Sequence, residues 1–429
     1  MSSATLQNEN LRQVRTVAFA SLIGTSIEWY DFFIYGTLTS IVFSRLFFPG
    51  SDALVSAILA YATFAVGFLV RPIGGIIIGH FGDRIGRKPL LIFTLSTMGV
   101  ATFLIGLLPT YEQVGVAAPM ALVTLRVMQG LALGGEWGGA VLMAFEFSNE
   151  ETRARYSCYP QIGLAIGLAL ATGVVTILTA VMDDRTFLAW GWRVAFLLSV
   201  VLLGVGTFVR LKVMESPEFH RTKVDAKIAK TPLFDVIRQH KREIILGWGA
   251  RLIDGNVFSI YAIFSIGFLA TVANIPRTTV LFAITVAALA LTVTIPLASI
   301  WADRVGRRKV YIWFSIICGV AAFPILATMQ YSGNSIVASA ALVVGLGIIY
   351  APVYGPQPAI FCELFDTNVR YTGISIIYQI GAILSVSIAP IVATTLLAYG
   401  NNTPWAIASY MMIAGLISAA CVSKMGKAF

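Results

Sequence analysis

Long apolar stretches separated by short polar segments dominate the pattern along the chain. A helix needs about 20 consecutive apolar residues to cross a hydrocarbon layer about 30 Å thick. Twelve stretches meet this length, and we place them near residues 17–42, 53–79, 89–108, 118–147, 156–182, 190–210, 243–270, 278–300, 310–330, 335–361, 371–398 and 403–423. The pattern therefore predicts an all-α membrane protein with twelve transmembrane helices.

One long polar connection divides the chain. It runs from Leu211 to Arg242 and is rich in lysine and arginine. We interpret residues 1–210 as an N-terminal six-helix bundle, 211–242 as a cytoplasmic linker and 243–429 as a C-terminal six-helix bundle.

Composition and charge support this interpretation. The chain is 57% hydrophobic and only 12% charged, whereas soluble domains carry about 25% charged residues. Its net charge of +9 comes from basic residues between the apolar stretches. With both termini in the cytoplasm, most of them fall on the cytoplasmic side, as the positive-inside rule requires. We therefore attribute the charge to membrane topology and expect no nucleic-acid partner.

A sequence motif occurs once in each half. Residues 79–88 (GHFGDRIGRK) follow the second stretch and residues 299–308 (SIWADRVGRR) follow the eighth, so that Asp83 and Asp303 lie 220 residues apart. A second pair of landmarks, Glu146 with Arg155 and Glu363 with Arg370, occurs in the same order. Two matching landmarks at nearly the same offset predict two homologous halves around a central cavity.

The G-x-x-x-D-R-x-G-R-[KR] motif resembles the signature of the major facilitator superfamily. More narrowly, the segments EWYDFFIYG, RPIGG, RVMQG, GGEWGG and GWR resemble the metabolite:proton symporter family; they begin at residues 28, 71, 126, 134 and 191. Arg251 with Asp254, and Tyr378 with Gln379, most resemble the shikimate transporters of that family. The resemblance implies two pseudo-symmetric six-helix bundles, both termini in the cytoplasm and transport by alternating access.

Seven ionisable residues lie inside the predicted helices, although a charge at mid-bilayer costs at least about 2.5–3.5 kcal/mol. They are Glu28, Asp31, Arg71, Arg126, Glu136, Arg251 and Asp254. Such residues are functional by default. The alternative is that they form buried ion pairs that only fix helix packing. Arg71 precedes Pro72 and could simply satisfy backbone carbonyls, and Glu136 lies among glycines that favour close helix contact.

An ion gradient is the expected energy source, because the chain has no phosphate-binding G-x-x-x-x-G-K-[ST] loop. A carboxyl group in a low-dielectric cavity is a natural proton carrier. Asp31 matches the first-helix aspartate that related symporters use with a fourth-helix arginine, here Arg126. The resemblance thus implies that Asp31 and Arg126 couple the proton, with Glu28 and Glu136 as weaker candidates.

The predicted cargo is a small organic acid. Arginine pairs with carboxylates through two parallel hydrogen bonds, so that Arg71, Arg126 and Arg251 favour an anion over a cation or a neutral sugar. Polar partners for hydroxyl groups are Asp254, Tyr35, Tyr354, Gln357, Tyr378 and Gln379. Shikimate or a related hydroxylated carboxylate would use both sets. A dicarboxylate, another carboxylate or a betaine remains an alternative, as does export of drugs or metabolites, and the tyrosines could instead serve packing.

Charged residues in the loops on the cytoplasmic side are expected to gate the cavity. They are Asp83, Arg84, Arg87, Glu146, Arg155, Asp303, Arg307, Glu363 and Arg370. Their alternative role is that of solvated positive-inside loops, because exposed ion pairs contribute little.

Other classes of protein find little support. No cluster of residues indicates a metal site, and no Ser or Cys nucleophile lies beside a His in a predicted helix, so we expect neither an enzyme nor a cofactor. A receptor or scaffold would not need gating loops in both halves. We expect a monomer in the lipid bilayer of a bacterial cytoplasmic membrane, with an organic acid and H⁺ as its partners.

Overall fold

The protein is helical throughout the part of the chain that the structure describes. The computed structural model describes the backbone of residues 3–50, 53–211 and 232–426. Twelve helical segments there are long and apolar enough to cross a membrane, from Val14–Leu38 to Trp405–Lys424. The predicted all-α fold with twelve membrane helices is therefore confirmed, and the cytoplasmic position of both termini stays a prediction.

The N-terminal half contains six of these segments, several of them built from more than one helix. Its helices are α1 (Ser3–Leu38), η1 (Thr39–Phe43), α2 (Ser44–Leu46), α3 (Ala53–Leu69), α4 (Arg71–Ile85), α5 (Arg87–Leu107), α6 (Tyr111–Val114), α7 (Ala117–Glu146), η2 (Glu150–Thr152), α8 (Arg153–Ser157), α9 (Tyr159–Val181), α10 (Asp184–Thr186), η3 (Phe187–Gly191), α11 (Trp192–Leu197) and α12 (Ser199–Leu211).

The C-terminal half contains the other six. Its helices are α15 (Lys241–Phe258), η4 (Ser259–Phe264), α16 (Ser265–Thr271), α17 (Arg277–Val305), α18 (Arg307–Tyr331), α19 (Ser335–Val343), η5 (Val344–Ile349), α20 (Ala351–Tyr354), α21 (Gln357–Cys362), α22 (Arg370–Ala382), η6 (Ile383–Ser387), α23 (Ala389–Tyr399) and α24 (Trp405–Lys424). In the segment predicted as a linker, the structure describes helix α14 (Pro232–Gln239), and residues 212–231 lie outside the described part. The limits of the two domains therefore stay a prediction.

The repeated motif has a glycine with positive φ at the same position in both halves. Its glycine separates α4 from α5 at Gly86 (φ 110°) and α17 from α18 at Gly306 (φ 112°). Side chains with a Cβ rarely adopt this conformation. A glycine is therefore required where each chain half turns between two membrane helices.

Proline marks the break within the second segment. α3 ends at Leu69, and α4 begins at Arg71 with Pro72 in its first turn. Proline has no N–H to donate and is favoured there. The break places Arg71 at a helix start, inside the membrane-crossing segment.

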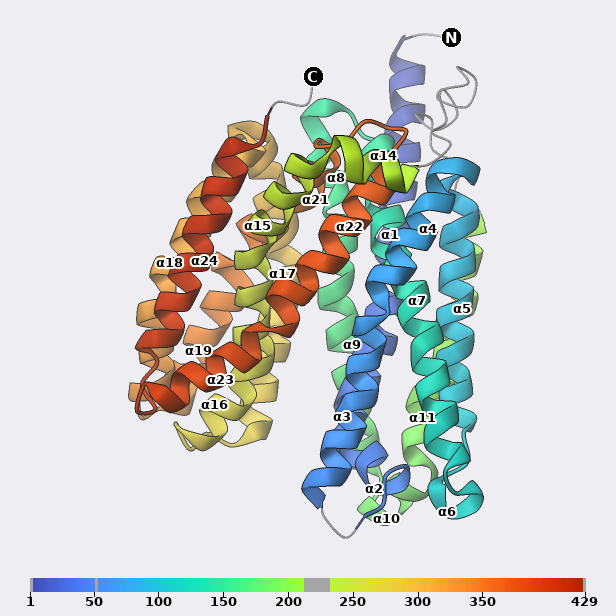
Figure 1. Ribbon diagram of the computed structural model, residues 1–429, viewed down its shortest axis with the longest axis vertical. Coiled ribbons are helices and arrows are strands. Elements are labelled where there is room, and N and C mark those ends of the chain that lie inside the picture. Colours follow the sequence, from blue (N-terminus) through green and yellow to red (C-terminus); the bar gives the residue numbers. More distant parts are fainter. Residues whose placement is uncertain (1–2, 51–52, 212–231, 427–429) are drawn as a thin grey trace.

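The two halves meet mainly near the chain termini. Figure 1 shows the two ends of the chain on one side of the molecule, called here the terminus side, where the ribbons of the halves run close together. There α22 packs against α4 and α7, and α17 packs against α8 and α9. Toward the opposite end the ribbons diverge (Figure 1).

Glycines allow this close approach. A Cβ at Gly82 would lie 2.1 Å from the ring of Tyr371, and one at Gly75 would lie 3.0 Å from Gln379. The side chains of Tyr371 and Gln379 on α22 therefore occupy the space that a side chain at Gly82 or Gly75 of α4 would need. The contact closes the terminus side.

Candidate functional site

Arg71 is a buried cation that lies against aromatic rings. Its side chain is only 7% exposed, yet it forms no ion pair or hydrogen bond with any described residue. Its guanidinium carbon lies 4.1 Å from the ring centroid of Phe68 and 4.7 Å from that of Phe32. Aromatic faces attract a desolvated cation by about 2 kcal/mol. The N–H groups of Arg71 are thus available to a ligand.

Arg126 lies near Arg71 and is held by neutral groups. It donates to Gln129 Oε1 at 2.8 Å, and its guanidinium carbon lies 3.9 Å from the ring centroid of Tyr35. A Cβ on Gly67 would lie 2.8 Å from one of its nitrogens. The charges of Arg71 and Arg126 act on each other. Two cations are therefore concentrated in one region of the N-terminal half.

Asp31 reaches Arg126 through two neutral side chains and not by direct pairing. The Thr102 hydroxyl donates to Asp31 Oδ2 at 2.8 Å. The same hydroxyl oxygen accepts from Gln129 Nε2 at 2.7 Å. All four side chains are buried. Within the described residues, Asp31 and Arg126 form no ion pair, and Asp31 Oδ1 has no hydrogen-bond partner.

The other two acids of this half have different surroundings. Glu28 lies close enough to Arg71 for its charge to act on that guanidinium. Glu136 accepts a hydrogen bond of 2.5 Å from Thr94, which ties α7 to α5. This geometry favours the structural alternative for Glu136.

In the C-terminal half an arginine is already neutralised. Arg251 donates to Asp254 Oδ2 at 2.8 Å and to Gln357 Oε1 at 3.2 Å, and both charged side chains are at most 4% exposed. The other Asp254 oxygen accepts a bond of 2.5 Å from Tyr350. The charge of Arg251 is therefore balanced by Asp254 in this structure.

Aromatic and amide side chains join the two halves beside this pair. The Tyr378 ring lies between Arg251, 3.6 Å from its centroid, and Trp137 of the N-terminal half, stacked at 3.5 Å. Gln379 donates to the Gly134 carbonyl at 2.8 Å. Tyr354 accepts from Gln161 at its backbone carbonyl, at 3.2 Å.

Tyr35 has its hydroxyl engaged within the N-terminal half. This hydroxyl shares a hydrogen bond of 2.5 Å with Thr63, while the face of the ring lies against Arg126. Tyr35 therefore contributes its ring to the region around Arg126.

At the terminus side, ion pairs and hydrogen bonds to the backbone connect the two halves. Asp303 accepts from the backbone N–H groups of Ala154 and Arg155 at 3.1 and 2.8 Å. Arg307 bridges Asp303, Glu363 and the Glu150 carbonyl. Arg370 donates to Glu146 across the halves at 3.5 Å.

Three predicted gating residues remain outside this network. The side chains of Asp83 and Arg87 lie outside the described residues. Arg84 is exposed and contacts His80 at 3.5 Å. Of the two copies of the motif, only the second therefore contributes ion pairs to this network among the described residues.

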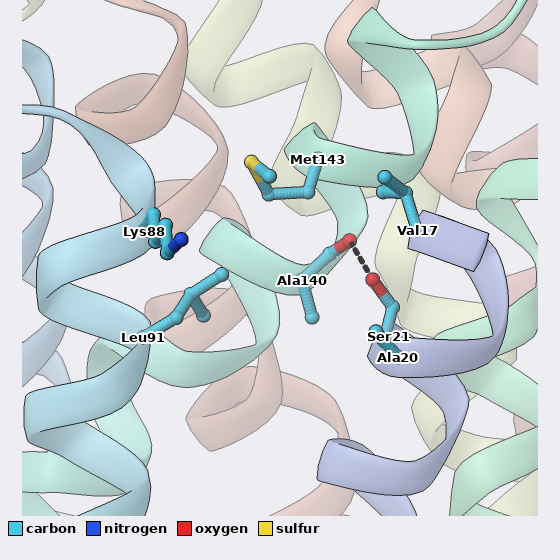
Figure 2. A pocket seen from close by; sticks show the side chains of 7 residues that line it. All are labelled: Val17, Ala20, Ser21, Lys88, Leu91, Ala140 and Met143. Carbon is cyan, nitrogen blue, oxygen red and sulfur yellow. Dashed lines mark hydrogen bonds between the residues drawn. The ribbon is translucent and has the colours of Figure 1, made fainter. Parts of the chain in front are cut away.

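A small pocket lies elsewhere, within the N-terminal half (Figure 2). It is lined by Val17, Ala20, Ser21, Lys88, Leu91, Ala140 and Met143 of α1, α5 and α7. Ser21 donates to the Ala140 carbonyl at 3.0 Å, and Lys88 donates to that of Leu211 at 3.0 Å. Because its lining is mainly apolar and belongs to one half, we do not assign the substrate to this pocket.

Sequence reasoning missed the neutral partners of the charged groups. Gln129 belongs to the RVMQG segment, and its position three residues after Arg126, which places both on one helix face, is the signal that could have identified it. Nothing in the sequence around Thr102 or Phe68 indicates that they contact a charged residue. Their roles depend on which helices pack together.

Both halves of the chain match known transporter families. Residues 16–245 match the family model "Sugar (and other) transporter", and residues 248–425 match "Major Facilitator Superfamily". The inner membrane metabolite transport protein YhjE of Escherichia coli is 41% identical over 89% of this chain and 87% of its own. The shikimate transporter of E. coli is 36% identical over 96% of this chain and 94% of its own.

Solved structures share the fold. The proton:xylose symporter XylE, bound to 6-bromo-6-deoxy-D-glucose, has a TM-score of 0.79 at 14% identity and covers 97% of both chains. Together with the sequence matches, this identifies a membrane transporter of the metabolite and sugar type, and not an enzyme. The chain belongs to the major facilitator superfamily.

Proposed function

We propose that the protein is a proton-coupled symporter that imports a small hydroxylated organic acid, such as shikimate, by alternating access. The observation that carries the proposal is Arg71. It is a buried guanidinium on aromatic rings without an ion pair to any described residue. Removing a partner from a buried charge costs about 3–5 kcal/mol of free energy. Because Arg71 is buried without such a partner among the described residues, an incoming carboxylate would gain binding free energy by pairing with it.

In this proposal the carboxylate binds at Arg71 and Arg126. Both belong to the N-terminal half, and among the described residues Arg126 donates a hydrogen bond only to Gln129. Arg251 is also one of the three arginines predicted to bind the substrate, but its charge is balanced by Asp254. It contributes by holding Asp254 and Tyr378 in place.

The C-terminal half supplies hydroxyl partners. Tyr354, Gln357 and Tyr378 surround Arg251 and Asp254. A hydroxylated ring acid would exchange hydrogen bonds with these groups while its carboxylate meets the arginines. The shikimate transporter among the relatives supports this class of cargo.

The proposed orientation places the terminus side in the cytoplasm of a bacterial cell. The contacts there would then form the closed inner gate, and the structure would represent an outward-facing state. The positive-inside distribution of basic residues supports this topology.

The test is uptake into proteoliposomes that contain the purified protein. We expect labelled shikimate to accumulate against its gradient when the outside is acidic, and accumulation to collapse when an uncoupler is added. Asp31→Asn should lose accumulation but retain exchange of labelled for unlabelled substrate. Accumulation that survives the uncoupler would overturn proton coupling.

A panel of competitors distinguishes the cargo classes. Hydroxylated monocarboxylates should compete best, because they use both the arginines and the hydroxyl partners. Stronger competition by simple dicarboxylates or betaines would replace shikimate with that class. Efflux against the gradient in place of uptake would favour the exporter.

A further inference from the structure

The chain of side chains between Asp31 and Arg126 has a fixed direction. Arginine can only donate hydrogen bonds, so that the Gln129 oxygen must face Arg126 and its NH₂ group must face Thr102. The Thr102 oxygen therefore accepts from Gln129. This leaves the single Thr102 proton for one of its acceptors.

Thr102 has two acceptors within reach and one proton. Its hydroxyl lies 2.8 Å from Asp31 Oδ2 and 3.0 Å from the Met98 carbonyl of its own helix. A carboxylate is the stronger acceptor. An ionised Asp31 thus accepts the hydrogen bond from Thr102, whereas a protonated Asp31 allows the hydroxyl to turn toward the Met98 carbonyl.

We propose that Thr102 and Gln129 are positioning residues that transmit the protonation of Asp31 to the substrate-binding Arg126. This proposal rests on the proposed function. When the substrate carboxylate draws Arg126 away, Arg126 no longer donates to the Gln129 oxygen. The Gln129 amide can then rotate, so that its oxygen faces Thr102. Thr102 then donates to Gln129, and Asp31 loses its donor.

The sign of this coupling suits symport. A hydrogen bond donated to a carboxylate stabilises its charged form. Its loss on substrate binding favours protonated Asp31, and a protonated Asp31 reciprocally releases Arg126 for the substrate. Substrate and proton therefore promote each other's binding without direct contact between Asp31 and Arg126.

Other ionisable groups around Asp31 are not part of this chain. Tyr30, the neighbour of Asp31 on α1, is a neutral phenol that donates to the Ala195 carbonyl at 2.9 Å. Helices α5, α7, α9 and α11 pack against α1, and their described ionisable side chains are Lys88 on α5, Arg126, Glu136 and Glu146 on α7, Tyr159 on α9 and Arg193 on α11. Lys88 lies about 21 Å along α5 from Thr102, and Arg193 donates to backbone carbonyls.

The experiment measures the half-saturation concentration for shikimate exchange in proteoliposomes over a series of pH values. We expect it to rise with pH in the wild type. In Thr102→Val, which removes the hydroxyl at similar volume, this rise should shrink by roughly tenfold, a typical size for coupling between sites. Gln129→Leu should have the same effect, and the double variant should add nothing further.

Two further variants separate coupling from structure. Thr102→Ser keeps a hydroxyl and should restore the wild-type pH dependence. Thr124→Val is the matched control, because Thr124 is exposed on α7 and donates only to Met120 of its own helix. Wild-type pH dependence in Thr102→Val would overturn the proposal, as would loss of exchange at low pH in both Thr102→Val and Gln129→Leu. Absence of proton-driven uptake by the wild type would instead overturn the proposed function.

Discussion

At the scale of the residue, the candidate site separates charges that are neutralised from charges that are available. All three arginines lie against aromatic rings, but within the described residues only Arg251 is also paired with a carboxylate, that of Asp254. A cation on a ring keeps its hydrogen-bond donors for another partner. In the proposed function the N-terminal half thus receives the anion, and the C-terminal half holds polar groups in place.

Replacing Arg71 tests this assignment. We expect Arg71→Gln to raise the half-saturation concentration for shikimate exchange by at least roughly tenfold, because a hydrogen bond to a charged group contributes about 1.5–3 kcal/mol. Arg71→Lys should have a smaller effect, since it keeps the charge without the planar fork.

The matched control is Arg185→Gln, because Arg185 is exposed on α10. Its exchange kinetics should equal those of the wild type. An unchanged half-saturation concentration in Arg71→Gln would refute the proposed role of Arg71 as an anion partner.

At the scale of the element, long apolar runs made the helices predictable from the sequence, whereas the contacts between helices were not. A charge such as Arg71 or Asp31 is conspicuous because its burial in lipid is costly. Thr102 is not conspicuous, because its hydroxyl can bond the preceding turn of any helix. Its contact with Asp31 arises only from the packing of α5 against α1.

The motif glycine makes a prediction about stability. Gly306 adopts φ 112°, and the nearest atom to a Cβ there is 3.7 Å away, so that Gly306→Ala would suffer from backbone strain and not from a clash. Such strain costs about 1–3 kcal/mol. We expect Gly306→Ala to lower the melting temperature in detergent by at least about 2 °C.

Gly204→Ala is the control for Gly306→Ala. Gly204 lies inside α12 with no atom within 4 Å of a Cβ, so that alanine should be neutral or stabilising there. Equal melting temperatures for the two variants would contradict the strain argument.

At the scale of the whole molecule, closure of the terminus side depends on side chains of one half fitting against glycines of the other. Tyr371 is fully buried and donates to the Gly135 carbonyl at 2.8 Å. A Cβ at Gly82 would lie 2.1 Å from its ring, and one at Gly139 would lie 2.6 Å from its hydroxyl. The ring is therefore confined from two sides in the closed arrangement, and this confinement ends when the halves separate.

Gly82→Ala should accordingly shift the population toward a state that is open on the terminus side. Destabilising one of two states changes their ratio tenfold for every 1.4 kcal/mol, about the cost of overpacking a well-packed contact. Spin labels at Ile85→Cys and Lys309→Cys, two exposed positions on this side, would report longer distances in the variant. The same labels in Gly204→Ala should give the wild-type distribution, and an unchanged distribution in Gly82→Ala would show that the contact with Tyr371 does not control closure.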